Sequence, residues 1–419
     1  MNIPQGYKQT EFGPIPLDWN LCTFKDVLAT FSSGATPYRG IPEYYNGDVR
    51  WISSGELNYN HIYDTLEHIS QQAVRNTNLR IHKPGTFLIA ITGLEAEGTR
   101  GRCAFVGAPS ATNQSCLAIN GTDKMCTEYL FWFYRMWGQY LAFKYCQGTK
   151  QQSYTADIVK KLPIYGPKDI AEQRAIAEAL SDVDSLIAAM DKKIAKKRLL
   201  KQGAMQQLLT GKKRLPGFTD EWEEITFGEY VDIYRGGSPR PIENYITDNP
   251  NGVNWIKIGD VKPNEKYINK TEECIIPDGV SRSRRVYVGD FILSNSMSFG
   301  RPYILGIDGC IHDGWLVIQN YHNTFDKDYL YYLLCSEYVM MQYIGMAAGS
   351  SVKNLNKEKV ASLQLCVPTT IKEQQAIATI LSDMDKEIAY LEAQRDKYRL
   401  LKSGMMQKLL TGQIRLKTE

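Results

Sequence analysis

The sequence lacks the residue patterns that catalytic and metal-binding proteins need. Its nine cysteines include no C-x-x-C pair, and its five histidines do not fall at metal-ligand spacing. Neither a zinc site nor a disulfide framework is therefore predicted, and we expect reduced thiols and a cytoplasmic location. There is no G-x-x-x-x-G-K-[ST] loop, G-x-G-x-x-G turn after a strand, G-x-S-x-G elbow or Asn-Pro-Pro-aromatic site. These absences favour a binding protein with no catalytic residue, metal or cofactor of its own.

Strong charge and long apolar runs are also missing. The net charge of +3 is too small to indicate nucleic-acid binding without a local cluster of basic residues. No apolar run is long enough to span a membrane, and the first residues do not resemble a signal peptide. Apolar, charged, glycine and proline contents are those of an ordinary globular protein, and 419 residues allow two to four domains.

One long segment occurs twice. It begins with Glu172-Gln173 and ends with Thr210-Gly211, and it begins again with Glu373-Gln374 and ends with Thr411-Gly412. The copies are 201 positions apart at both ends, and more than half of the aligned residues between Glu172 and Leu215 are identical. The chain is therefore a duplicated unit of about two hundred residues.

Both copies have the apolar spacing of a long helix in a coiled coil. The seam weakens in the second half of each copy, where Lys197, Lys201, Arg395 and Lys402 occupy it. Because one narrow apolar stripe does not stabilise a lone helix, we expect the two helices to pack on each other. The predicted pairing residues are Ile176, Leu180, Val183, Ile187 and Met190 in the first copy, and Ile377, Leu381, Met384, Ile388 and Leu391 in the second.

A globular head precedes each helix. We expect a first head over residues 1–167, a first spacer helix over 168–215, a second head over 216–368 and a second spacer helix over 369–419. Each head shows short strand-like runs, such as Phe87–Ile91 and Phe291–Leu293, and the first adds an aromatic helix from Thr127 to Cys146 whose stripe we interpret as core. The predicted fold class is α+β, with two α/β heads separated by two long helices in an antiparallel coiled coil. Such packing would place the heads at opposite ends, related by a pseudo-twofold axis.

The two heads share a framework but differ between its fixed points. Gly237-Ser238-Pro239 matches Gly34-Ala35-Thr36-Pro37, Trp255-Ile256 matches Trp51-Ile52, and Gly300-Arg301 matches Gly101-Arg102. The helices would therefore perform one task twice, whereas the heads would perform two versions of one task.

Basic and polar residues gather in the head loops. Arginine suits guanine edges, glutamine and asparagine suit adenine, and lysine suits phosphate. A solvated loop is the alternative at each position. The candidate DNA-binding residues are Arg39, Arg100, Arg102, Lys150, Gln151, Gln152 and Ser153 in the first head, and Arg240, Arg282, Arg284, Arg285, Arg301, Lys353 and Asn354 in the second.

The whole chain resembles the specificity subunit of Type I restriction-modification systems. The resemblance rests on two diverged heads, each followed by a helix that opens with E-Q-x-A-I-A and closes with Leu-Leu-Thr-Gly. It implies that the heads are target recognition domains, each reading half of a split double-stranded DNA site. It also implies that the helices bind two methyltransferase subunits, which carry S-adenosylmethionine and methylate adenine N6. Motor-nuclease subunits, which use ATP and Mg, would complete the restriction enzyme.

Two other functions remain open from the residues alone. The chain could be a coiled-coil scaffold whose two heads bind proteins or peptides, or a methyltransferase with an unrecognised cofactor site. Salt-sensitive binding to duplex DNA would favour the specificity subunit, and salt-insensitive binding of a partner would favour the scaffold. Transfer of a labelled methyl group by the lone chain would favour the methyltransferase.

Overall fold

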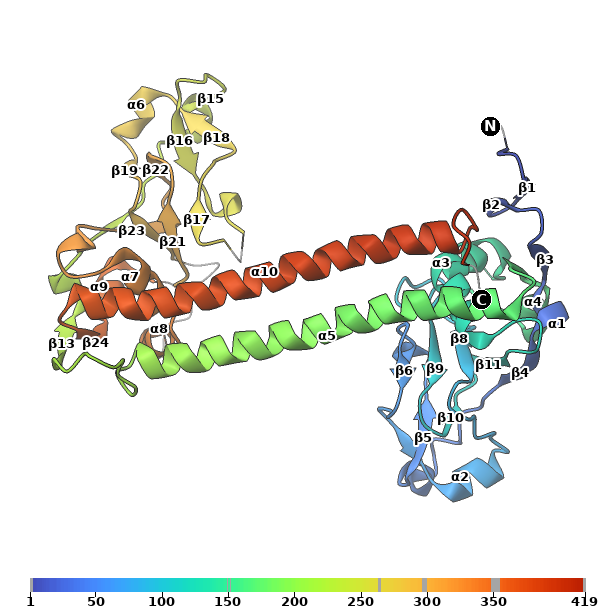
Figure 1. Ribbon diagram of the computed structural model, residues 1–419. Coiled ribbons are helices and arrows are strands. Elements are labelled where there is room, and N and C mark those ends of the chain that lie inside the picture. The colour runs from blue at the N-terminus through green and yellow to red at the C-terminus, as the bar shows by residue number, and fades with distance from the viewer. Residues whose placement is uncertain are drawn as a thin grey trace. The chain divides into compact units, whose positions relative to one another are not determined.

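The chain divides into two compact units, and each combines segments that are distant in sequence. The structure, a computed structural model, describes residues 3–148, 150, 152–262, 265–295, 300–347 and 355–416. Unit 1 contains Met1–Met190 and Gln394–Glu419, whereas unit 2 contains Asp191–Ala393. Each unit therefore holds one head, part of the helix α5 (Ile170–Leu208) and part of the helix α10 (Ile371–Leu409) (Figure 1).

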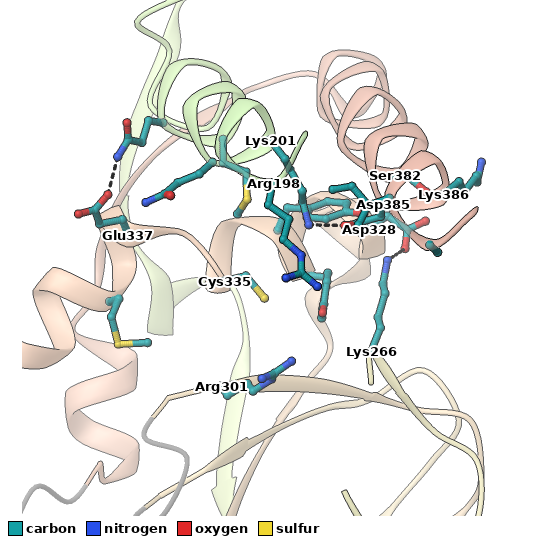
Figure 2. A pocket seen from close by; sticks show the side chains of 18 of the residues that line it. Arg198, Lys201, Lys266, Arg301, Asp328, Cys335, Glu337, Ser382, Asp385 and Lys386 are labelled. Atoms are coloured by element: carbon teal, nitrogen blue, oxygen red, sulfur yellow. Dashed lines mark hydrogen bonds and ion pairs between the residues drawn. The ribbon is translucent and has the colours of Figure 1, made fainter. Parts of the chain in front are cut away.

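Within each unit the two long helices run antiparallel. In unit 1, Asp184 of α5 forms an ion pair with Lys402 of α10. In unit 2, Lys201 of α5 forms one with Asp385 of α10 at 2.5 Å, which Figure 2 shows. The second pair is the first with the roles of the helices exchanged, as an internal twofold repeat requires. The predicted fold class, with its antiparallel pairing and repeat, is confirmed.

The apolar seam is buried at most of the predicted positions, including Ile187. The exceptions are Val183, Met190 and Met384, which are half-buried. Where the seam lapses in unit 2, Lys197 pairs with Glu387 at 2.7 Å, so cross-helix ion pairs replace apolar contacts. The buried clusters join Ile176 and Leu180 to Leu409 and Leu410 in unit 1, Ile377 and Leu381 to Leu208 and Leu209 in unit 2, and Ile194 to Ile388 and Leu391 in unit 2.

The repeated glutamine fastens each long helix to its own head. In unit 1, Gln173 Nε2 donates to the carbonyls of Lys124 and Pro167, each at 2.9 Å, and its Oε1 accepts from the Cys126 N–H at 3.0 Å. Gln173 is fully buried, so all three bonds are shielded from water. This clamp explains why glutamine recurs at this position, because only a carboxamide donates twice and accepts once here.

Unit 2 has the same clamp. Gln374 donates to the carbonyls of Thr324 and Pro368, at 2.9 and 3.0 Å, and accepts from the Asp326 N–H at 2.8 Å. The preceding glutamate recurs for a different reason. Glu373 is buried and receives the guanidinium of Arg214 at 2.8 Å, so the end of α5 is bound to the start of α10.

The head of unit 1 is built on a mixed five-stranded sheet in the order β4-β11-β8-β9-β6. Its middle strands consist of continuous apolar runs, as expected where both faces are covered. The strands are β4 (Ala29–Ser33), β6 (His61–Ile62), β8 (Phe87–Ala90), β9 (Cys103–Val106) and β11 (Cys116–Asn120).

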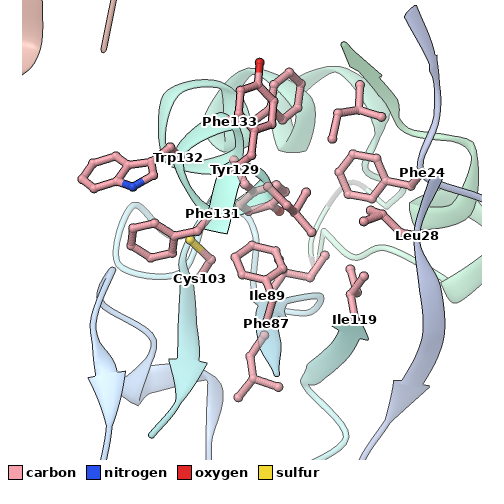
Figure 3. Packing of buried hydrophobic residues seen from close by; sticks show 14 of the residues in the cluster. Phe24, Leu28, Phe87, Ile89, Cys103, Ile119, Tyr129, Phe131, Trp132 and Phe133 are labelled. Carbon is pink, nitrogen blue, oxygen red and sulfur yellow. The ribbon is translucent and has the colours of Figure 1, made fainter. Parts of the chain in front are cut away.

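The aromatic helix α3 (Thr127–Tyr145) packs on this sheet. Tyr129, Phe131 and Phe133 lie over Phe87 and Ile89 of β8 (Figure 3), and all five are buried. The prediction that the aromatic stripe is core is confirmed.

Smaller elements complete the first head. These are a three-stranded sheet, β10-β5-β7, and two two-stranded sheets, β1-β2 and β12-β3. The bounds are β1 (Tyr7–Thr10), β2 (Gly13–Pro16), β3 (Asn20–Thr23), β5 (Val49–Ile52), β7 (His68–Ile69), β10 (Ser110–Thr112), β12 (Pro163–Gly166), α1 (Phe24–Val27), α2 (Gln71–Asn76) and α4 (Ala156–Lys161).

The head of unit 2 repeats this plan with a larger second sheet. Its first sheet has the order β14-β23-β20-β21-β17 and its second β15-β18-β16-β22-β19, and β13 pairs with β24. The first sheet and its pair comprise β13 (Trp222–Thr226), β14 (Asp232–Arg235), β17 (Tyr267–Ile268), β20 (Phe291–Ser294), β21 (Pro302–Leu305), β23 (Trp315–Gln319) and β24 (Gln364–Pro368). The second sheet comprises β15 (Ile246–Thr247), β16 (Val253–Ile256), β18 (Glu273–Ile275), β19 (Arg284–Val286) and β22 (Gly309–Ile311). The helices are α6 (Pro277–Val280), α7 (Lys327–Leu334), α8 (Glu337–Ala347) and α9 (Lys357–Ala361).

Within the described part of the chain, no helix combines the length and the apolar character needed to cross a lipid bilayer.

Candidate nucleic-acid interface

A tight turn after β14 organises the basic surface of the second head. A Cβ on Gly236 would lie 2.0 Å from the carbonyl oxygen of His312, so only glycine permits this approach. Gly236 N–H donates to the Trp315 carbonyl at 2.8 Å and Gly237 N–H to that of Ile311 at 3.1 Å. The turn is thereby fixed against the connection between β22 and β23.

Three predicted arginines gather around this turn. Arg240 forms an ion pair with Asp313 at 3.2 Å and remains 79% exposed. The backbone of Arg282 lies against Gly237, and the guanidinium of Arg284 stacks on Tyr234 at 4.9 Å. Arg235, which the sequence did not single out, receives Arg284 Nε at its carbonyl. These exposed cations form one surface, which suits a phosphate backbone and groove edges.

A hollow of about 780 Å³ opens beside this turn, lined by Arg240, Trp255, Lys257 and His312 among others. Burial lowers the pKa of His312, so its ring is neutral at pH 7. The hollow thus combines the exposed guanidinium of Arg240 with the uncharged rings of Trp255 and His312.

The other predicted residues of the second head lie elsewhere. Arg285 is half-exposed on β19, where it pairs in register with Cys310. Arg301 lies beside the cavity next to the long helices, with its guanidinium 5.6 Å from the Tyr303 ring centre. Lys353 and Asn354 lie outside the described residues.

In the first head, Arg39 follows the equivalent turn but is more constrained. Its guanidinium forms an ion pair with Glu67 at 2.8 Å and stacks on the rings of Tyr45 and Trp51, at 4.3 and 5.5 Å. The side chain is still 58% exposed, so one edge of the guanidinium is available to a ligand.

Two neighbouring loops bring together most of the remaining predicted residues of the first head. Arg100 closes its own loop by donating to the carbonyls of Leu94 and Glu95, each at 2.7 Å, and Glu95 accepts the backbone N–H of Gln152 at 2.8 Å. Ser153 bridges to Thr92 and Gln147 through backbone contacts. Arg102 binds Asn58 and stacks on Tyr59, Lys150 is exposed, and Gln151 lies outside the described residues.

The sequence did not identify the residues that face these turns. Thr36 binds the side chain of Gln114, and Ser238 donates to Asp313 at 2.8 Å. Their partners are more than seventy positions away, so only strand register could have revealed them. The one available signal was the shared Gly-x-[Thr/Ser]-Pro turn.

A cavity of about 960 Å³ lies in unit 2, where the second head contacts α5 and α10 (Figure 2). Asp385 accepts from Tyr332 at 2.8 Å besides its ion pair with Lys201, and Lys266 pairs with Asp328 at 2.7 Å. Burial raises the pKa of the Cys335 thiol here to about 11, so it is protonated and poorly nucleophilic at neutral pH.

Unit 1 fills the corresponding position with a guanidinium. Arg135 donates to Asp184 at 2.9 Å and stacks on Tyr59 and Trp132 at 5.2 and 5.1 Å. The aligned residue of unit 2 is Cys335, whose smaller side chain lines the cavity. Across the described residues, no cluster of three or more His, Cys, Asp or Glu side chains could hold a metal ion.

Comparison with known proteins gives consistent matches. The family model described as type I restriction modification DNA specificity domain matches residues 16–197 and 219–397. The putative type I restriction enzyme MjaX specificity subunit of Methanocaldococcus jannaschii is 27% identical over 99% of this chain and 98% of its own. The MjaVIII specificity subunit of the same organism is 23% identical over the same shares.

Two solved structures share the fold. The S subunit from M. genitalium matches with a TM-score of 0.59 at 13% identity, over 100% of this chain and 99% of its own. A chain solved in work on complex assembly of the type I R-M system matches with a TM-score of 0.61 at 15% identity, over 96% and 99%. One family match falls on each repeat and together they cover most of the sequence, so the chain belongs to the type I restriction-modification DNA specificity family and is the DNA-recognition subunit of such a system, not its catalytic part.

Proposed function

We propose that the protein reads a bipartite, asymmetric DNA site, one half with each head, and directs partner subunits to it. The observation that carries this proposal is the unequal divergence of the repeats. The helices keep the same glutamine clamp and the same ion pairs in both units. The head turns instead present different side chains on one backbone framework, as two readers of different half-sites would.

The spacing of the half-sites follows from general geometry. Two heads on one face of B-DNA favour half-site centres about one helical turn, roughly 10 base pairs, apart. If each head reads about three to five base pairs, an unread gap of about five to seven remains. The candidate DNA-binding residues given above would make the contacts.

Two methyltransferase subunits would bind the long helices. Supporting this stoichiometry, the exposed pair Leu199-Leu200 on α5 recurs as Leu400-Leu401 on α10. Large exposed leucines that survive in both copies of a duplication suit two equivalent contacts with a partner. Motor-nuclease subunits would then join the complex.

The cofactors would reside on those partners. S-adenosylmethionine would serve methylation of adenine N6, and ATP with Mg would serve the motor-nuclease subunits. We also infer a cytoplasmic location, where the genomic DNA and the partner subunits would be found.

Exchange of one head tests the proposal. Residues 218–365 are replaced by the second head of another family member, and genomic methylation is profiled in cells that contain the methyltransferase subunits. We expect one half of the methylated motif to change and the other half and the gap to persist. The matched control exchanges the first head, which should change only the opposite half.

A continuous palindromic motif, or a change in both halves after one exchange, would overturn the proposal. Loss of all methylation despite normal assembly would do the same for the assignment of one half-site to each head.

A further inference from the structure

The framework of the two heads defines equivalent positions through strand register. Trp51 pairs with Ala111 in the first head, and Trp255 pairs with Cys310 in the second. The connection that follows, leading to β11 or to β23, has the same length in both heads. The equivalent residues of turn and connection are Thr36 and Ser238, Tyr38 and Arg240, and Gln114 and Asp313.

At these positions both heads make the same contact with different chemistry. The hydroxyl of the turn residue binds the side chain in the connection: Thr36 binds Gln114, and Ser238 binds Asp313. A Cβ on Gly34 would lie 1.8 Å from the Thr112 carbonyl oxygen, so the first turn approaches its strand end as closely as the second does. The backbone is therefore a constant platform for a variable pair.

In the second head, the backbone of the connection is held in place while the side chains of Arg240 and Asp313 are exposed. The Asp313 carbonyl accepts from Asn295 Nδ2 at 3.0 Å and from Arg235 Nε at 3.3 Å, which fixes the connection. Arg240 is 79% exposed and the Asp313 side chain 42%. Gln114 is exposed in the first head. A reader of base edges needs this combination of a fixed backbone and exposed polar side chains.

We propose that these positions determine base specificity. Gln114, held by Thr36, reads an adenine through its carboxamide, which matches the N6 donor and N7 acceptor. In the second head, Arg240 reads a guanine, and Asp313, held by Ser238, accepts from N4 of the paired cytosine. This inference rests on the proposed function, because it presumes that each head reads one half-site.

The test is methylation profiling of the assembled methyltransferase carrying single substitutions. Gln114→Ala should relax one A·T position in one half-site, with discrimination at that position falling roughly 10- to 100-fold. Asp313→Ala should relax one G·C position in the other half-site by a similar factor. Thr36→Val and Ser238→Ala should weaken the same two positions, since the hydroxyls only orient the readers.

Matched controls remove similar side chains outside the pair. Gln71 lies in the first head and Asp248 in the second, and Gln71→Ala and Asp248→Ala should leave the methylated motif unchanged. Thermal melting of every variant checks that the fold persists. A variant that failed to melt like the parent would be replaced by Gln114→Glu or Asp313→Asn, which retain size and should still alter the same position.

Three outcomes overturn the inference. The motif could stay unchanged in the folded Gln114 and Asp313 variants, methylation could fall equally at all positions as expected for a phosphate contact, or the relaxed position could be G·C in the first head. Each leaves the bipartite function intact, which fails only if the parent protein itself directs methylation to no split site.

Discussion

At each junction of head and long helix, a single buried carboxamide makes three hydrogen bonds. Gln173 and Gln374 are the second residues of the repeated segment, and each binds the backbone just before the helix of its head. Buried backbone groups without partners cost more than the same groups in water, so the clamp discriminates strongly against other residues. Sequence identity at this position reflects satisfied hydrogen bonds at least as much as a shared partner.

Replacing Gln374 with Ala should destabilise unit 2. The Asp326 N–H would lose its acceptor, and the carbonyls of Thr324 and Pro368 would lose a donor. One buried orphan costs about 1–3 kcal/mol, so we expect a loss of about 3 kcal/mol in the free energy of unfolding. Denaturant unfolding and hydrogen exchange at the Asp326 amide measure it. Gln375→Ala changes an exposed neighbour and serves as the control; equal effects of the two would contradict the clamp.

Asp184 should make the stability of unit 1 depend on pH. Burial opposes its ionisation, yet Lys402 and Arg135 hold the pKa of this carboxylate below its usual value. A group with a lowered folded-state pKa stabilises the fold above its unfolded pKa of about 4, and this contribution disappears as the pH falls through the folded-state pKa. Asp184→Asn should therefore lower the Tm at pH 7, and the difference from the parent should shrink toward pH 3. Melting curves across this range, with exposed Asp182→Asn as the control, decide; a constant difference would show that charge is not the cause.

At the scale of elements, the helices and central strands could be predicted because their signals are local. The heptad of α5 and the apolar run of β8 are each recognisable from residues that are close together in the sequence. The candidate interface could not be predicted in full, because Gln114 and Asp313 reach their turns only through strand pairing across distant segments. Lys197 likewise marked only a weak point in the predicted seam, and its ion pair with Glu387 of α10 depends on the pairing of two distant helices.

The pairing of the long helices has a direct test at Ile388. This side chain is 8% exposed and packs with Ile194 and Leu391 in unit 2. Ile388→Asp would bury an unpaired charge between helices, which should lower the free energy of unfolding by roughly 3 kcal/mol. Ala393→Asp places the same charge at an exposed position of α10 and should cost little. Should the Ile388 variant unfold like the control in denaturant, the seam would not stabilise the pair.

At the scale of the whole molecule, the two duplicated units share one fold and one set of closing contacts, and they differ in a few side chains. Both units use the glutamine clamp, the buried glutamate and the lysine–aspartate pair between helices. They differ at Arg135 and Cys335, and at the exposed pairs of the head turns. The contacts that close each unit are thus retained, whereas the difference lies in one interior position beside the long helices and in the exposed pairs of the head turns.

The buried Glu172 also imposes an order on events at the ribosome. Its partner Arg415, whose Nε lies 2.6 Å from its carboxylate, follows 243 positions later. At about 5–20 residues per second, roughly 12 to 50 seconds separate the synthesis of the two. Arg214, in contrast, is already made when its partner Glu373 emerges. The nascent chain can therefore close its second unit before its first, so the two units are completed in the reverse of the order in which their heads are translated. A chain that ended before Arg415 would leave the Glu172 carboxylate without this guanidinium partner.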